Sequence, residues 1–187
     1  MIKELINQTS DAVVAAVKGV DDVLDALTST VKHQVVDAMK DTGEVSHTGV
    51  DVVASVASGA IKSAGQVGAS LSDVATSTMS GVINGASEVG GDVISAARGG
   101  ARGIVQTTAQ TGGDVGAVAV KAVDGAIKSA GQVGVDTTEA AKAAVGGALD
   151  ATASVGGDAA QKVREALLSA AALPHDVIDS LLKGDHK

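Results

Sequence analysis

Apolar residues recur along the chain in steps of four and three residues, which is the spacing of one face of an α-helix. From Ala60 the steps run 4, 3, 4, 4, 3, 4 and return to an equivalent position after 22 residues. Six turns in 22 residues give about 3.67 residues per turn, close to the α-helical value and far from the strand period of two. The pattern predicts an all-α protein of elongated amphipathic helices, built on 11- and 22-residue repeats and packed as a small-residue bundle or filament.

The predicted apolar stripe is made of small side chains and keeps its phase from Ala60 to Ala166. The opposite face carries polar residues such as Lys62 and Gln66, so the helices are amphipathic. We expect the stripe to face either lipid or a neighbouring helix. Its members are Ala60, Ala64, Val67, Leu71, Val82, Ala86, Val89, Val93, Ile104, Val115, Ala126, Ala130, Val133, Ala148 and Val155.

Glycine also follows the repeat. One column holds Gly59, Gly81, Gly103, Gly125 and Gly147, and one decapeptide, GAIKSAGQVG, occurs unchanged at Gly59–Gly68 and Gly125–Gly134. Each glycine inside a helix costs roughly 0.5–1 kcal/mol relative to alanine, so the chain needs a compensating interaction.

Close packing of helix backbones, which small residues four apart permit, would supply that interaction. Pairs with this spacing are Gly81/Gly85, Gly99/Gly103 and Gly112/Gly116. A further set lies beside the stripe, and we expect its members to be close-packing positions as well. These glycines are Gly68, Gly90, Gly112, Gly134 and Gly156.

Two alternatives to close packing stay open. The segment could be unfolded in water and become helical on lipid. Alternatively, the Gly-Gly-Asp triplets at 90–92, 112–114 and 156–158 could be turns, in which glycine ends one helix and aspartate caps the next. The unbroken phase of the stripe favours helix through these triplets, because a turn need not preserve it.

The repeat divides the chain into three segments. Residues 1–36 are predicted to form an N-terminal helical cap with a degenerate repeat, and residues 37–158 form the Gly/Ala/Val array. Residues 159–187 should contain a C-terminal helix, a break at Pro174 and a short terminal helix.

Composition narrows the possible functions. The 187 residues include no Phe, Tyr, Trp or Cys, and the net charge is −8, which argues against nucleic acid as a partner. No uncharged apolar stretch is long enough for a transmembrane span. A chain without cysteine fits a reducing compartment, so we predict a cytoplasmic protein, peripheral on a lipid surface.

Signs of catalysis are weak. Glu44 and His47 have the E-x-x-H spacing of di-metal sites, but such sites need a second copy, and the chain has none. We predict no catalytic residues, no metal and no cofactor.

The segments GVDTTEAAKAAVGGAL at Gly134–Leu149 and TTAQTGGDVGAV at Thr107–Val118 resemble the 11-residue amphipathic repeats of perilipins. Synucleins and group 3 late-embryogenesis proteins are similar at one remove. The resemblance implies that the protein coats a lipid or other hydrophobic surface. The alternative is a structural protein that self-assembles through its Ala/Gly/Val stripe, and a third hypothesis is a stress-protective role.

Overall fold

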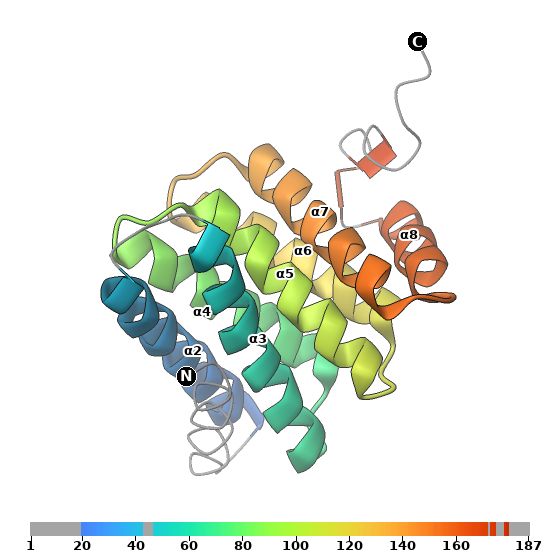
Figure 1. The fold of residues 1–187 in the computed structure, drawn as a ribbon, viewed down its shortest axis with the longest axis horizontal. Coiled ribbons are helices and arrows are strands. Elements are labelled where there is room, and N and C mark those ends of the chain that lie inside the picture. Colours follow the sequence, from blue (N-terminus) through green and yellow to red (C-terminus); the bar gives the residue numbers. More distant parts are fainter. Residues whose placement is uncertain (1–19, 43–46, 172, 175–177, 180–187) are drawn as a thin grey trace.

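The computed structural model describes residues 20–42, 47–171, 173–174 and 178–179. These residues form seven helices and no strand, which confirms the predicted all-α class. The helices are α2 (Val20–Thr42), α3 (His47–Val67), α4 (Leu71–Glu88), α5 (Val93–Gln110), α6 (Val115–Gln132), α7 (Thr137–Val155) and α8 (Ala159–Ser169). They pack against one another as a bundle, so the packed form of the prediction is the one observed (Figure 1).

Each repeat unit is one helix and one connection. Helices α4 to α8 begin one repeat apart, at Leu71, Val93, Val115, Thr137 and Ala159. The 22-residue period therefore measures the distance from one helix start to the next. The continuous helix expected through the Gly-Gly-Asp triplets is wrong, because the chain turns at every one of them.

The connection between α4 and α5 shows why the chain turns. Gly90 has a φ of +65°, a left-handed conformation that glycine adopts without steric cost. The N–H of Gly91 donates to the carbonyl of Ala86 at 2.8 Å, which is the bond of a Schellman C-cap. Asp92 then accepts from the N–H groups of Ile94 and Ser95 at 2.9 and 3.1 Å and begins α5.

The same C-cap chemistry recurs in the connections that follow α3, α5 and α6. Equivalent C-cap bonds run from Ala69 to Ala64 (3.0 Å), Gly113 to Thr108 (3.0 Å) and Val135 to Ala130 (2.9 Å). The side chains of Asp114 and Asp136 cap α6 and α7 as Asp92 caps α5. Asp158 occupies the corresponding position before α8, but its side chain makes no capping hydrogen bond. The aspartate column of the sequence is thus mainly a column of helix caps.

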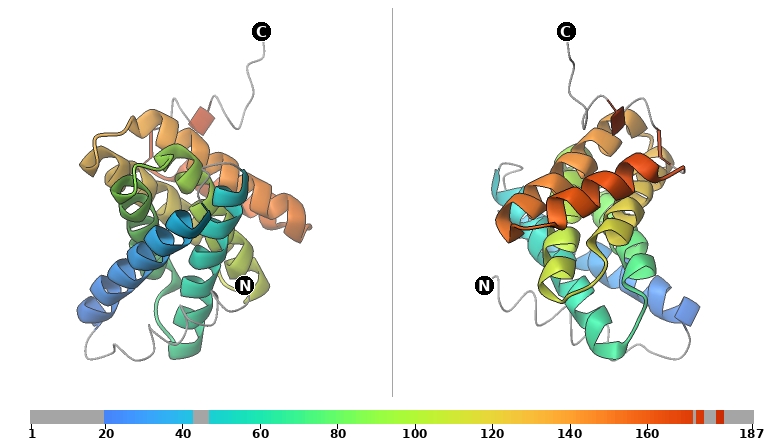
Figure 2. Two further views of the ribbon diagram at one scale, coloured as in Figure 1. Left: turned by 60° about the vertical axis from the view of Figure 1, so that its left-hand side comes forward. Right: turned by 90° about the vertical axis from the view of Figure 1, so that its right-hand side faces the viewer.

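The helices form two layers. The most extensive contacts join helices that are two apart in the sequence, so α3, α5 and α7 make one layer, and α2, α4 and α6 make the other. Figure 1 shows α3, α5 and α7 side by side, with α4 and α6 behind them. The helix α8 lies across one end of the bundle and packs mainly on α6 (Figure 2).

One hydrophobic cluster draws residues from all seven helices. The boundary predicted between residues 36 and 37 falls inside α2, whose Leu27 and Val31 belong to this cluster. The boundary at 158/159 coincides with the first residue of α8. That helix ends at Ser169, before Pro174, and most of the predicted terminal helix lies outside the described residues.

Candidate functional site

The stripe predicted from the sequence lies inside the bundle. Ten of its members are buried: Ala60, Ala64, Val82, Ala86, Val93, Ile104, Val115, Ala126, Ala130 and Ala148. Leu71, Val89 and Val133 lie near helix ends and are partly buried. Val155 is 38% exposed, and the side chain of Val67 is outside the described set. In this structure the stripe therefore packs the chain's own helices together.

The glycines expected beside the stripe do not pack closely. Gly68, Gly90, Gly112, Gly134 and Gly156 all have φ values between +65° and +76°, and a Cβ at any of them would meet no atom within 4 Å. They end helices instead of joining them. This part of the prediction is wrong, because the left-handed backbone at the connections, and not contact between helices, requires glycine there.

The close-packing glycines form the other column. Gly81 and Gly125 face the backbone oxygens of Thr28 and Thr76, and a Cβ on each would lie 2.6 and 3.2 Å from them. On Gly103 a Cβ would collide with the carbonyl of Ala54. Gly147, which occupies the same repeat position on α7, is equally tight against α5. We call these lines of closest approach between helices of one layer the seams.

The pairs Gly81/Gly85 and Gly99/Gly103 are confirmed as close-packing pairs. Gly85 would place a Cβ 2.8 Å from the carbonyl oxygen of Lys32, and Gly99 would place one 2.6 Å from that of Val50. Gly112 and Gly116 do not act together, because Gly112 is a turn residue while Gly116 packs against α8. The spacing of small residues thus found two of the seams.

Hydroxyl groups form hydrogen bonds across the seams, at sequence offsets of 49 or 45 residues. The hydroxyl of Ser129 on α6 donates to that of Ser80 on α4 at 3.0 Å, with an offset of 49 residues between them in sequence. The hydroxyl of Thr28 on α2 reaches the carbonyl of Ser77 on α4 at 3.3 Å over the same offset of 49. Two further seam bonds, from the Ser58 hydroxyl to the carbonyl of Gly103 and from the Thr76 hydroxyl to that of Lys121, have an offset of 45.

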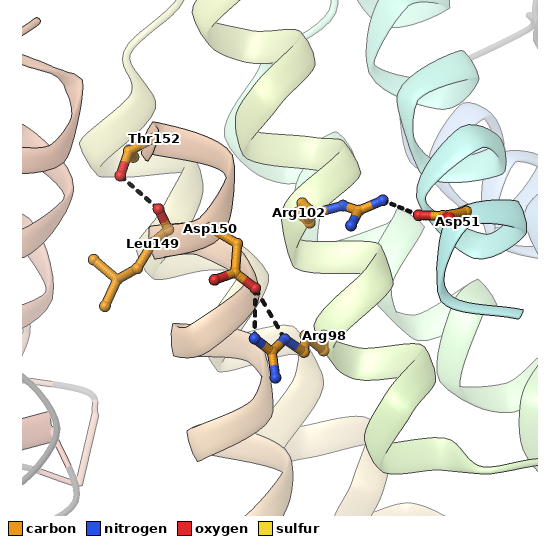
Figure 3. A network of polar contacts seen from close by, with 6 residues as sticks. All are labelled: Asp51, Arg98, Arg102, Leu149, Asp150 and Thr152. Carbon is orange, nitrogen blue, oxygen red and sulfur yellow. Dashed lines mark hydrogen bonds and ion pairs between the residues drawn. The ribbon is translucent and has the colours of Figure 1, made fainter. Parts of the chain in front are cut away.

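Ion pairs lie along the exposed edges of the seams (Figure 3). Both Nε and Nη2 of Arg98 on α5 donate to Oδ2 of Asp150 on α7, at 2.9 and 2.7 Å. On its other side α5 contacts α3 through Arg102 and Asp51. These charges are exposed, so each pair contributes little stability and mainly fixes which helices lie side by side.

The remaining seam pair joins α2 to α4. The ammonium of Lys32 lies 2.5 Å from a carboxylate oxygen of Glu88. The hydrogen bond from Lys32, and then its charge, hold the pKa of Glu88 below the usual value.

The Asp92 carboxyl at the start of α5 also has a lowered pKa, first because the Ser95 hydroxyl donates a hydrogen bond to it.

Sites for chemistry are scarce in the part of the chain that the structure describes. It contains no group of three or more His, Cys, Asp and Glu side chains able to hold a metal ion. Glu44 and the His47 side chain, which carry the E-x-x-H spacing, lie outside the described set. No helix in the described ranges combines the length and apolar character needed to cross a bilayer.

Open grooves lie on the surface of the described residues. One, of about 980 Å³, runs between α6 and α8 and is lined by both helices. Two smaller ones, of about 340 and 520 Å³, adjoin each other beside α3 and α5 and share Lys62 and Thr111. Sequence reasoning missed the smaller grooves, because the stripe does not indicate where polar faces of two helices meet.

A scan against models of protein families found no match to this chain. A search of curated proteins likewise found no similar sequence.

Proposed function

We propose that the protein is a non-enzymatic structural protein, a helical scaffold that uses its Ala/Gly/Val stripe to pack its own repeats into two layers. One observation carries this proposal: the glycine column brings backbones of the same layer into contact while the stripe is buried beneath it. Small residues on both sides of a seam let the helices approach closely. Many van der Waals contacts then stabilise the bundle together, although the chain has no large aromatic side chains.

Circular dichroism combined with sedimentation, with and without liposomes, tests the proposal. A scaffold is strongly helical in buffer, melts cooperatively and keeps its helicity when vesicles are added. Low helicity in buffer that rises on lipid would overturn the scaffold proposal.

A second candidate is the coating of a lipid or other hydrophobic surface, which requires the bundle to open. The phase of the stripe favours it: the steps of four and three run through every connection, so a chain straightened at its turns would present one continuous apolar face. The partly buried Leu71, Val89 and Val133 and the exposed Val155 lie at helix ends, where opening would begin.

A disulfide lock separates the two candidates. The chain has no cysteine, so Ser80→Cys with Ser129→Cys introduces one pair across the α4–α6 seam, where the hydroxyls are 3.0 Å apart. If coating requires opening, the oxidised double variant binds vesicles poorly and regains binding on reduction, while each single variant behaves like wild type. Equal vesicle binding in both redox states would reject opening as the route.

A further inference from the structure

The groove between the polar faces of α3 and α5 has the features of a small binding site. It encloses about 340 Å³ and is lined by Ser58, Lys62, Gln106, Thr107, Gln110 and Thr111. Every lining side chain can donate a hydrogen bond, and none of them is a carboxylate. Its volume is at the lower end of the range found for ligand pockets. The two helices lie side by side in Figure 1.

One hydroxyl in this groove lacks a partner. Thr107 is only 7% exposed, yet its hydroxyl makes no hydrogen bond with the described residues. Its neighbours are satisfied, because the hydroxyl of Ser58 donates to the carbonyl of Gly103 and that of Thr111 donates to the carbonyl of Thr107. Among the described residues only the Thr78 hydroxyl is both fully buried and without a partner, so the Thr107 hydroxyl still reaches the groove, where it can donate to an acceptor atom of a ligand.

The ammonium of Lys62 is also available to a ligand. The same decapeptide recurs at Gly125–Gly134, where Lys128 pairs with Asp124 one helical turn earlier at 2.7 Å. Ser58 occupies the position equivalent to Asp124, so Lys62 has no acidic residue there. No ion pair to Lys62 exists among the described residues. The two copies of the decapeptide therefore differ: Lys128 is paired with an aspartate, whereas Lys62 lines the groove.

We propose that this groove binds a small oxyanion, a carboxylate or a phosphate group. Lys62 supplies the positive charge, the amides of Gln106 and Gln110 supply neutral donors, and the Thr107 hydroxyl supplies the donor nearest the core. The absence of a carboxylate among these lining residues argues against a cationic ligand. This site goes beyond the scaffold and lipid-coating proposals, because it lies on the polar faces of the helices, and it requires α3 and α5 to stay packed together.

Titration of the whole protein with inorganic phosphate and, separately, with acetate at constant ionic strength tests the site. Amide chemical shifts of α3 and α5 report binding, and the anion that saturates at lower concentration identifies the source. Lys62→Gln should weaken saturable binding by about tenfold or more, the loss expected for one charge-assisted hydrogen bond. Lys128→Gln removes the same charge from the same decapeptide and should leave binding unchanged.

Two further variants separate a binding role from a structural one. Ser58→Asp recreates the Asp124–Lys128 arrangement and should abolish binding; because it also removes the hydrogen bond from Ser58 to the Gly103 carbonyl, circular dichroism checks that the variant keeps its helicity. Thr107→Val removes the unpartnered hydroxyl and should weaken binding in a protein that melts near the wild-type temperature. The proposal is overturned if neither anion saturates, if Lys62→Gln and Lys128→Gln weaken binding equally, or if Thr107→Val leaves affinity unchanged.

Discussion

Gly103 on α5 lies directly against the carbonyl oxygen of Ala54 on α3, with no room for a Cβ between them. The contact is backbone to backbone, so no side-chain rotation can relieve an added methyl group. The α3–α5 seam therefore depends on glycine at this position.

Gly103→Ala should lower the free energy of unfolding by about 1–3 kcal/mol, because overpacking forces two helices apart. The matched control is Gly146→Ala on α7, where a Cβ would meet nothing within 4 Å. There the gain in helix propensity should raise stability by up to about 1 kcal/mol. Denaturant unfolding followed by circular dichroism measures both, and equal effects at the two positions would contradict the seam.

The turn glycines make a different prediction. Gly112 has a φ of +75° and open space around it, so Gly112→Ala strains the backbone without any clash. We expect a loss of about 1–2 kcal/mol in unfolding free energy. Gly112→Asn should recover part of that loss, because asparagine tolerates the left-handed conformation better than alanine. An alanine variant as stable as wild type would mean that this connection is not a turn in solution.

The fold class followed from the period of the stripe, whereas the connections did not. Every helix from α4 to α8 begins at the same position of the 22-residue repeat, so the stripe stays in phase whether the chain turns or continues. The phase therefore cannot detect the turns at Gly90 and Gly112. The residue types at the triplets distinguish a turn from a continuous helix better than the phase does. A glycine followed two residues later by an aspartate is typical of a helix C-cap followed by the N-cap of the next helix.

The candidate site was predicted less well than the fold. Glycine spacing located the seam pairs Gly81/Gly85 and Gly99/Gly103, because close helix approach has a sequence signature. Gly68 and its repeats were predicted to be packing residues on the assumption that the helix continues through them. Because the chain turns there, that prediction is wrong. The groove at Lys62 depends on which polar faces meet across α3 and α5, and that pairing of alternate helices is a tertiary property.

Asp92 should make stability depend on pH. The pKa of the Asp92 carboxyl is lowered in the folded state, first by the hydrogen bond from Ser95. The ionised carboxylate therefore stabilises the folded protein. This stabilisation is fully present above the unfolded-state pKa of about 3.9 and is lost as the pH falls through the folded-state pKa. At pH 7, Asp92→Ala should cost about 1 kcal/mol, as for other N-caps.

Unfolding of wild type and Asp92→Ala from neutral to acidic pH measures this difference, which should shrink on the acidic side. Asp158→Ala is the control, because the Asp158 side chain makes no capping bond and its removal should change stability by less than about 0.5 kcal/mol. A difference for Asp92 that stays constant down to low pH would show that its charge is not involved.

Thr78 is fully buried, and its hydroxyl has no hydrogen-bond partner among the described residues. Thr78→Val keeps the shape and removes the unsatisfied group, so it should raise the free energy of unfolding by about 1 kcal/mol. Thr108 is equally buried but donates to the carbonyl of Ile104 at 2.8 Å, so Thr108→Val should give no such gain. Thermal melts of the two variants show whether the unpaired hydroxyl of Thr78 lowers the stability of the folded protein. Equal melting temperatures for the two variants would contradict this.

The closed two-layer bundle brings Ser80 and Ser129 together across a seam. If the same residues lay on one continuous helix, their offset of 49 positions would separate them by about 74 Å. The most direct measurement is oxidation of the Ser80→Cys/Ser129→Cys protein at low concentration, with the disulfide identified by mass spectrometry. The bundle predicts rapid, nearly complete formation of the disulfide within monomers, whereas free thiols or bonds only between chains would contradict it.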